Sequence, residues 1–146
     1  MGKLSFSLLI LASALPVFSS PLSSRAITAV GGIIRPSNWT CGTHGYASWE
    51  ASQAAYLGYS LLESSDYNGK YPHEYMNREG FDFDTEPPYY EYPILPDGPY
   101  TGGSPGPDRV IFDNDGMLEG LITHTGASGD NFVACSEEEI TGAEQH

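Results

Sequence analysis

The sequence predicts an α+β domain in which one amphipathic helix packs on a twisted antiparallel β-sheet. Small and apolar residues recur at three- and four-residue steps between Ser48 and Ser64, the spacing of a helix with one buried face. Short runs of aromatic and β-branched residues follow, separated by turns rich in glycine and proline. One helix followed by several neighbouring strands is typical of an α+β architecture.

The predicted helix has a start signal, an apolar face and a stop signal. Ser48 is expected at its N-cap, Glu50 lies in the first turn, and the turn residues 65–69 end it. The alanine and glycine positions would let the helix lie close to a sheet. The residues of its apolar face are Ala51, Ala54, Ala55, Gly58, Leu61 and Leu62.

The strands are expected after the helix. They cover residues 71–75, 89–95, 108–112, 118–124 and 131–135. Residues 114–116 (Asn-Asp-Gly) predict a hairpin turn, and Pro93 is expected at a bulge or an unpaired position. Side chains alternate between the faces of a strand, so Glu91 points away from the face that carries Tyr90 and Tyr92.

The two ends of the chain differ in character from the middle. Residues 1–19 resemble a signal peptide, with Lys3, a short apolar run and a small-residue cleavage site after Ser19, or alternatively near Ala26. The apolar run is too short to span a bilayer. We expect a flexible lead-in over residues 20–36, a folded domain over 37–135 and an acidic, disordered tail over 136–146. The sequence therefore predicts a secreted, soluble protein.

Charge and cysteine content limit the possible functions. The formal net charge is −13, and the few cations beyond the leader do not cluster, so nucleic acid would have to bind in a specific pocket rather than by general attraction. Cys41 and Cys135 would pair in an oxidising compartment; two separate buried thiols are the alternative. Residues 38–40 (Asn-Trp-Thr) form a glycosylation sequon.

Four side chains are candidates for chemistry on the open face of the sheet. If the strands form one sheet with the helix behind it, this face would gather Glu91, His73, Arg109 and His124. A carboxylate, two imidazoles and a guanidinium make an acid–base set with an anion clamp. Taken singly, each has a simpler explanation, since an isolated histidine is more often structural and an arginine after an aspartate is more often a surface pair.

The motifs around these residues carry more weight than the residues alone. They are Tyr71-Pro72-His73-Glu74-Tyr75, Glu79-Gly80-Phe81-Asp82-Phe83, Tyr89-Tyr90-Glu91-Tyr92-Pro93-Ile94, and the segments 100–110 and 122–133. In this order they resemble the fungal guanyl-specific ribonucleases, the ribonuclease T-one family. The resemblance runs from about Asn38 to Cys135.

The resemblance implies metal-free acid–base cleavage of RNA. Glu91 would be the general base that takes the proton of the ribose 2′-hydroxyl, and His124 the general acid that protonates the leaving 5′-oxygen. His73 would support the base. The scissile phosphate would be held or flanked by Arg109, Tyr71 and Phe132. A 2′,3′-cyclic phosphate would form first and then open to a 3′-phosphate, with no cofactor.

The resemblance also implies recognition of guanine by residues 75–79 and 130. Tyr75 would stack on the base, and Glu79 would accept hydrogen bonds from N1–H and the exocyclic amine. Backbone groups of Met76, Asn77 and Asp130 would read the rest of the edge. Three positions depart from the familiar pattern: Met76 stands where asparagine is common, Arg78 where a second aromatic residue covers the base, and Asp130 where asparagine is usual. Arg78 would stack through its guanidinium plane.

Two structural expectations follow from the same resemblance. Ser37 and Gly45 stand where many relatives have the cysteines of a second bridge, so we expect the Cys41–Cys135 bridge alone and a looser hairpin over residues 38–46. The peptide bonds before Pro72 and Pro88 are expected to be cis.

The favoured interpretation is therefore a secreted, monomeric endoribonuclease that cuts single-stranded RNA after guanosine, without DNA or membrane partners. One alternative is a catalytically silent ribonuclease-like binding protein or effector, which would be expected to lack the acid or the base; this chain keeps both. A relative of the ribosome-directed toxins is a further alternative, but those proteins carry long basic loops, whereas the loops here are short and the chain is acidic.

Overall fold

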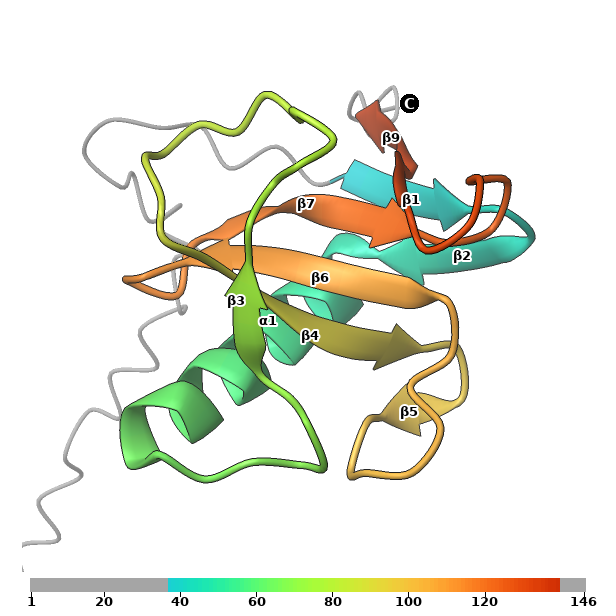
Figure 1. Ribbon diagram of the computed structural model, residues 1–146. Coiled ribbons are helices and arrows are strands. Elements are labelled where there is room, and N and C mark those ends of the chain that lie inside the picture. The colour runs from blue at the N-terminus through green and yellow to red at the C-terminus, as the bar shows by residue number, and fades with distance from the viewer. Residues whose placement is uncertain (1–36, 140–146) are drawn as a thin grey trace, which may run out of the picture. The chain divides into compact units, whose positions relative to one another are not determined.

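The computed structural model describes residues 37–139 (Figure 1). The predicted signal peptide and lead-in lie outside the described residues. The elements in chain order are β1 (Ser37–Cys41), β2 (His44–Ala47), α1 (Ser48–Ser64), β3 (His73–Tyr75), β4 (Tyr89–Leu95), β5 (Gly98–Pro99), β6 (Asp108–Asp113), β7 (Leu118–Thr123), β8 (Val133–Ala134) and β9 (Ser136–Glu139). The predicted α+β class is confirmed.

Helix α1 has the predicted length, but its first turn is capped differently. Ala47, not Ser48, occupies the N-cap, and its backbone N–H donates to the Glu50 carboxylate at 2.7 Å. The prediction of Ser48 as the cap was wrong because Glu50 reaches back and satisfies a free N–H one residue earlier. The helix ends where Ser65 adopts a left-handed conformation with φ of 54°.

The buried face of α1 is formed by small residues, as the sequence predicts. Ala51, Ala54, Ala55 and Gly58 are buried against the large sheet, and Figure 1 shows the helix running behind it. A Cβ atom at Gly58 would lie 2.9 Å from Cβ of Tyr92. Only glycine permits this close approach of helix and sheet.

The large sheet has the order β3-β4-β6-β7-β8, with β5 added to β4, and all neighbouring pairs are antiparallel. Tyr92 and Ile94 of β4 join the core beneath α1. The side chain of Tyr89 points to the other face of the sheet, where it belongs to a second apolar cluster with Ile111 and Ile122. Pro93 lies between the residues of β4 that pair with β3 and those that pair with β5, so its missing N–H interrupts neither of these two ladders.

A second sheet with the order β2-β1-β9 corrects the predicted C-terminal tail. We expected disorder from residue 136 onward, but β9 pairs with β1 from Ser136–Thr40 to Glu139–Ser37, beside it in Figure 1. The Cys41–Cys135 disulfide places β9 at the unpaired edge of β1, where backbone groups need partners. The described side chains of β9 stay exposed, which is why their acidic composition does not prevent pairing. Residues 140–146 lie outside the described part.

The expected disulfide and cis peptide bonds are confirmed. The bridge between Cys41 and Cys135 is present, and the peptide bonds before Pro72 and Pro88 are cis. The hairpin over residues 38–46, expected to be looser, is paired continuously from Asn38–Ala47 to Cys41–His44.

Candidate active site

The candidate residues approach one another on the sheet face opposite α1. Glu91 lies at the centre of β4, directly across from His73 on β3 and from Ile111 on β6. Arg109 lies on β6, across from Ile122 of β7. His124 directly follows the last residue of β7. Alternation along the four neighbouring strands β3, β4, β6 and β7 therefore brings their side chains to one face.

His73 and Glu91 form an ion pair. The distance from His73 Nε2 to Glu91 Oε1 is 2.9 Å, and His73 Nδ1 lies 3.1 Å from the backbone carbonyl of Glu74. Both ring nitrogens face acceptors, as a protonated imidazole requires. The hydrogen bond to Glu91 raises the pKa of His73, although partial burial opposes the shift. Glu91 is 5% exposed, and its Oε2 atom has no hydrogen-bond partner among residues 37–139.

The Arg109 guanidinium is buried and held by backbone carbonyls. Its Nη1 donates to the carbonyl oxygens of Pro105, Gly106 and Asp108 at 3.2, 2.9 and 2.8 Å. Its Nη2 donates to the Tyr71 hydroxyl at 2.9 Å, whereas Nε has no partner within the described segment. Asp108 and Arg109 are 0% and 3% exposed, so the alternative of a surface pair is wrong.

His124 is fixed by its backbone and by one ring nitrogen. The backbone N–H donates to the Pro107 carbonyl at 3.0 Å, and Nδ1 lies 2.8 Å from the carbonyl of Asn131. Because a carbonyl only accepts, Nδ1 carries a proton and Nε2 is the ring nitrogen left for proton transfer. The ring stacks on Phe132 with centroids 3.9 Å apart.

A continuous series of contacts joins the base candidate to the acid candidate. Beyond the ion pair with Glu91, His73 stacks on Tyr71 with centroids 4.9 Å apart. The Arg109 guanidinium carbon lies 5.1 Å from the Tyr71 ring centre and 6.0 Å from that of Phe132, which stacks on the ring of His124. All six residues with implied roles at the phosphate therefore form one cluster, with the guanidinium between the two ends.

An open pocket of about 350 Å³ adjoins this cluster. Glu91, His73 and Phe132 belong to both, so a ligand in the pocket would reach the base candidate. The pocket also contains every residue predicted to read guanine: Tyr75, Met76, Asn77, Arg78, Glu79 and Asp130. Another pocket, of about 130 Å³, is largely apolar, lies between α1 and β4–β5, and is lined by none of the candidates.

Glu79 is oriented by two donors inside the pocket. Its Oε2 accepts from the Tyr75 hydroxyl at 2.8 Å, and its Oε1 accepts from the backbone N–H of Phe132 at 3.0 Å. Burial opposes ionisation, but these hydrogen bonds and the charge of Arg78 outweigh it and lower the pKa of Glu79. Each oxygen retains a second lone pair, so the carboxylate is ionised and still able to accept hydrogen bonds.

The side chain of Asn77 closes the pocket loop by hydrogen bonds. Asn77 has a positive φ of 46°, its side-chain nitrogen donates to the Phe81 carbonyl, and its Oδ1 accepts from the Phe81 N–H, both at 2.8 Å. Its side-chain amide is therefore engaged within the loop. Tyr75 is only 7% exposed and contacts Phe132 edge to face at 6.0 Å.

Sequence reasoning missed the backbone acceptors of the site. The carbonyls of residues 105–108 and of Asn131 orient Arg109 and His124, and side-chain patterns carry no signal for them. Within residues 37–139, no three His, Cys, Asp or Glu side chains are grouped so that they could hold a metal ion.

Comparison with known proteins gives matches in both sequence and fold. Residues 34–136 match the family model described as ribonuclease. The chain is 60% identical over 99 residues to guanyl-specific ribonuclease Ms of Aspergillus phoenicis, covering 67% of this chain and 94% of the relative. It is 52% identical over 105 residues to guanyl-specific ribonuclease T1 of Aspergillus oryzae, covering 70% and 81%.

Two further matches concern structure and location. An extracellular guanyl-specific ribonuclease Fl1 of Gibberella baccata is 50% identical over 99 residues, covering 66% of this chain and 94% of the relative. Among solved structures, the ribonuclease He1 from Hericium erinaceus aligns with a TM-score of 0.52 at 36% identity, covering 68% of this chain and 98% of that chain.

Proposed function

This chain belongs to the fungal guanyl-specific ribonuclease family, and on that premise we propose that it is an endoribonuclease that cuts single-stranded RNA on the 3′ side of guanosine. The observation that carries the proposal is the cluster that connects Glu91 to His124 through the buried guanidinium of Arg109. An acid and a base on either side of a phosphate-binding cation are what transesterification by the substrate's own 2′-hydroxyl requires.

Glu91 serves as the general base. Its Oε1 is engaged by His73, and its buried Oε2 is the free acceptor for the 2′-hydroxyl proton. The contact with the neighbouring imidazole orients the carboxylate. The 2′-oxygen attacks phosphorus, the bond to the 5′-oxygen breaks, and His124 Nε2 supplies the proton to that leaving oxygen. The product is a 2′,3′-cyclic phosphate. Water then opens it to a 3′-phosphate, with His124 acting as the base and Glu91 as the acid.

Arg109 and Tyr71 stabilise the charge that develops on the phosphoryl oxygens. Nη1 of Arg109 is occupied by carbonyls, so the edge formed by Nε and Nη2 remains for the phosphate. The Tyr71 oxygen accepts from Nη2, which frees its own O–H to donate. Burial raises the pKa of Tyr71 despite the opposing charge of Arg109, so this donor stays protonated. Phe132 stacks on the ring of the acid.

Guanine is recognised by Glu79 in the adjoining pocket. An ionised acceptor suits guanine, which presents N1–H and an exocyclic amine, and disfavours adenine, whose N1 is itself an acceptor. Tyr75 and Arg78 cover the base, and backbone groups of Met76, Asn77 and Asp130 complete the contacts; all these residues line the pocket.

We further propose that the protein is secreted as a monomer. The extracellular relative and the signal-like N-terminus support secretion. The described residues contain no helix long and apolar enough to cross a membrane. Asn38 in β1 is exposed and precedes Trp39 and Thr40, which supports glycosylation at this sequon.

The proposal is tested by incubating a defined RNA with the protein in the presence of a chelator and mapping the new ends. We expect cuts only after guanosine, with a cyclic phosphate appearing before the 3′-phosphate. Binding without cleavage would favour the silent binding protein, and cuts without base preference would refute the role given to Glu79.

A further inference from the structure

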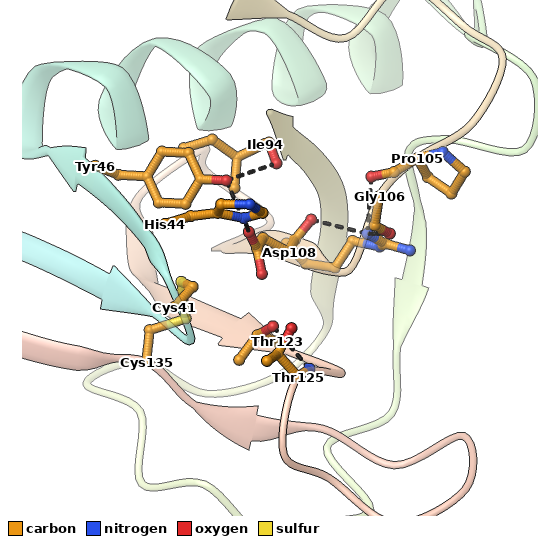
Figure 2. A network of polar contacts seen from close by, with 11 residues as sticks. Cys41, His44, Tyr46, Ile94, Pro105, Gly106, Asp108, Thr123, Thr125 and Cys135 are labelled. Carbon is orange, nitrogen blue, oxygen red and sulfur yellow. Dashed lines mark hydrogen bonds and ion pairs between the residues drawn. A yellow bond between two sulfur atoms is a disulfide. The ribbon is translucent and has the colours of Figure 1, made fainter. Parts of the chain in front are cut away.

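Asp108 is a buried carboxylate that the chemistry above does not use. It begins β6, directly before Arg109, and is 0% exposed. Its Oδ2 accepts two hydrogen bonds of 2.7 Å, one from the Tyr46 hydroxyl and one from His44 Nδ1, and Figure 2 shows both side chains meeting there. Its Oδ1 has no partner in the described part of the chain. A carboxylate so deeply buried depends on the few donors that it has.

The backbone around Asp108 holds two of the proposed catalytic groups. Carbonyls within residues 105–108 accept the hydrogen bonds from Arg109 Nη1, and that of Pro107 accepts the backbone N–H of His124. A shift of this segment would therefore move the guanidinium and the imidazole together.

The two donors to Asp108 come from β2 in the small sheet. Tyr46 is 2% exposed, and its hydroxyl also lies 3.3 Å from the Ile94 carbonyl. Burial, and next the hydrogen bond to Asp108, raise the pKa of Tyr46, so it remains a donor. The His44 side chain is about one-third exposed and packs edge to face against Tyr46 with centroids 6.3 Å apart. Replacing His44 therefore removes a donor without opening the core.

We propose that His44 and Tyr46 are positioning residues for RNA cleavage. By holding the Asp108 carboxylate they fix residues 105–108, and through this segment they set the placement of Arg109 and His124 against the scissile phosphate. The inference rests on the proposed function and adds two residues from the small sheet to it. None of these contacts involves a residue that lines the guanine pocket, so binding of the base alone should change little when they are removed.

The experiment compares His44→Ala and Tyr46→Phe with the conservative variant His44→Asn, which keeps a neutral donor. Thr43→Ala, at an exposed position in the adjacent turn, is the matched control. Each folded protein is assayed well below its unfolding temperature for kcat and KM on a GpN dinucleoside phosphate. Guanosine, which probes the base pocket alone, and guanosine 3′-monophosphate, which also probes the phosphate site, are titrated by calorimetry.

We expect His44→Ala and Tyr46→Phe to lower kcat by about tenfold, the scale of a small misplacement of catalytic groups. They should weaken binding of guanosine 3′-monophosphate but not of guanosine, while His44→Asn and Thr43→Ala stay near wild type. If the two residues had a purely structural role, only the unfolding temperatures would change. The inference would be overturned if His44→Ala and Tyr46→Phe both left kcat and the binding of guanosine 3′-monophosphate unchanged. Wild-type protein that fails to cleave would instead overturn the proposed function.

Discussion

The contact between His73 and Glu91 makes the stability of this protein depend on pH. The folded state raises the pKa of His73 above its ordinary value of 6.5, chiefly through the hydrogen bond to Glu91. A raised pKa means that the folded state binds the proton more tightly, so the stabilisation is complete below pH 6.5 and is lost as the pH rises through the folded-state pKa.

We therefore expect His73→Gln, which keeps a neutral donor, to differ most from wild type at low pH. Urea unfolding between pH 5 and 9 should give a difference in unfolding free energy that shrinks as the pH rises. A difference that stays constant across this range would show that the ion pair contributes nothing through the charge of His73.

Glu79 is the residue on which base preference depends. Replacing it with glutamine removes a charged acceptor, and the loss of one such hydrogen bond, about 1.5–3 kcal/mol, corresponds to roughly a 10- to 100-fold fall in discrimination. The measurement is the ratio of kcat/KM for GpN and ApN. Glu74→Gln, an exposed carboxylate that lines the same pocket, is the control and should leave the ratio unchanged. An unchanged ratio in Glu79→Gln would contradict the assignment.

Side-chain placement was predictable only as far as strand alternation reaches. Alternation correctly put Glu91 on the face away from Tyr92. It did not reveal that Arg109 is buried, because an aspartate followed by an arginine usually lies at the surface. Nor did it reveal Asp108, whose partners His44 and Tyr46 lie more than sixty residues away in the chain.

At the level of elements, the packing of α1 on the sheet depends on Gly58. A Cβ atom there would lie 2.8 Å from Phe112 Cε1 and 2.9 Å from Tyr92 Cβ. Gly58→Ala should destabilise the protein by about 1–3 kcal/mol despite the higher helix propensity of alanine, because the helix must move off the sheet. Urea unfolding measures this, with exposed Ser52→Ala as the control. A Gly58→Ala variant that is more stable than wild type would contradict this, because it would mean that a Cβ atom fits between the helix and the sheet.

The elements themselves were predictable where local signals exist. The bounds of α1 follow from its periodic small residues and the turn after it, and those of β4 from an aromatic run between turns. Strand β9 was not predictable, since four exposed positions with three glutamates become a strand only when the disulfide places them beside β1. Strand β3 is shorter than expected because it begins only after Pro72, which cannot donate to a ladder.

At the scale of the whole molecule, the acidic composition opposes the binding of a polyanion. The protein has a formal charge of −13 and therefore repels long RNA. Salt screens this repulsion, because the Debye length falls from about 30 Å at 0.01 M salt to about 10 Å at 0.1 M. We expect kcat/KM on long RNA to rise over this range, and that on a dinucleoside phosphate to change less. A fall on long RNA would indicate general electrostatic attraction, which this charge does not supply.

The central claim is that Glu91 and His124 act as base and acid on one phosphate. The most direct test measures kcat/KM on a GpN dinucleoside phosphate for Glu91→Gln and His124→Ala, with Glu63→Gln on the exposed side of α1 as the control. We predict losses on the order of 10²–10⁴-fold in the first two variants, intact circular dichroism, and no loss in the control. Wild-type turnover in either folded variant would contradict the account.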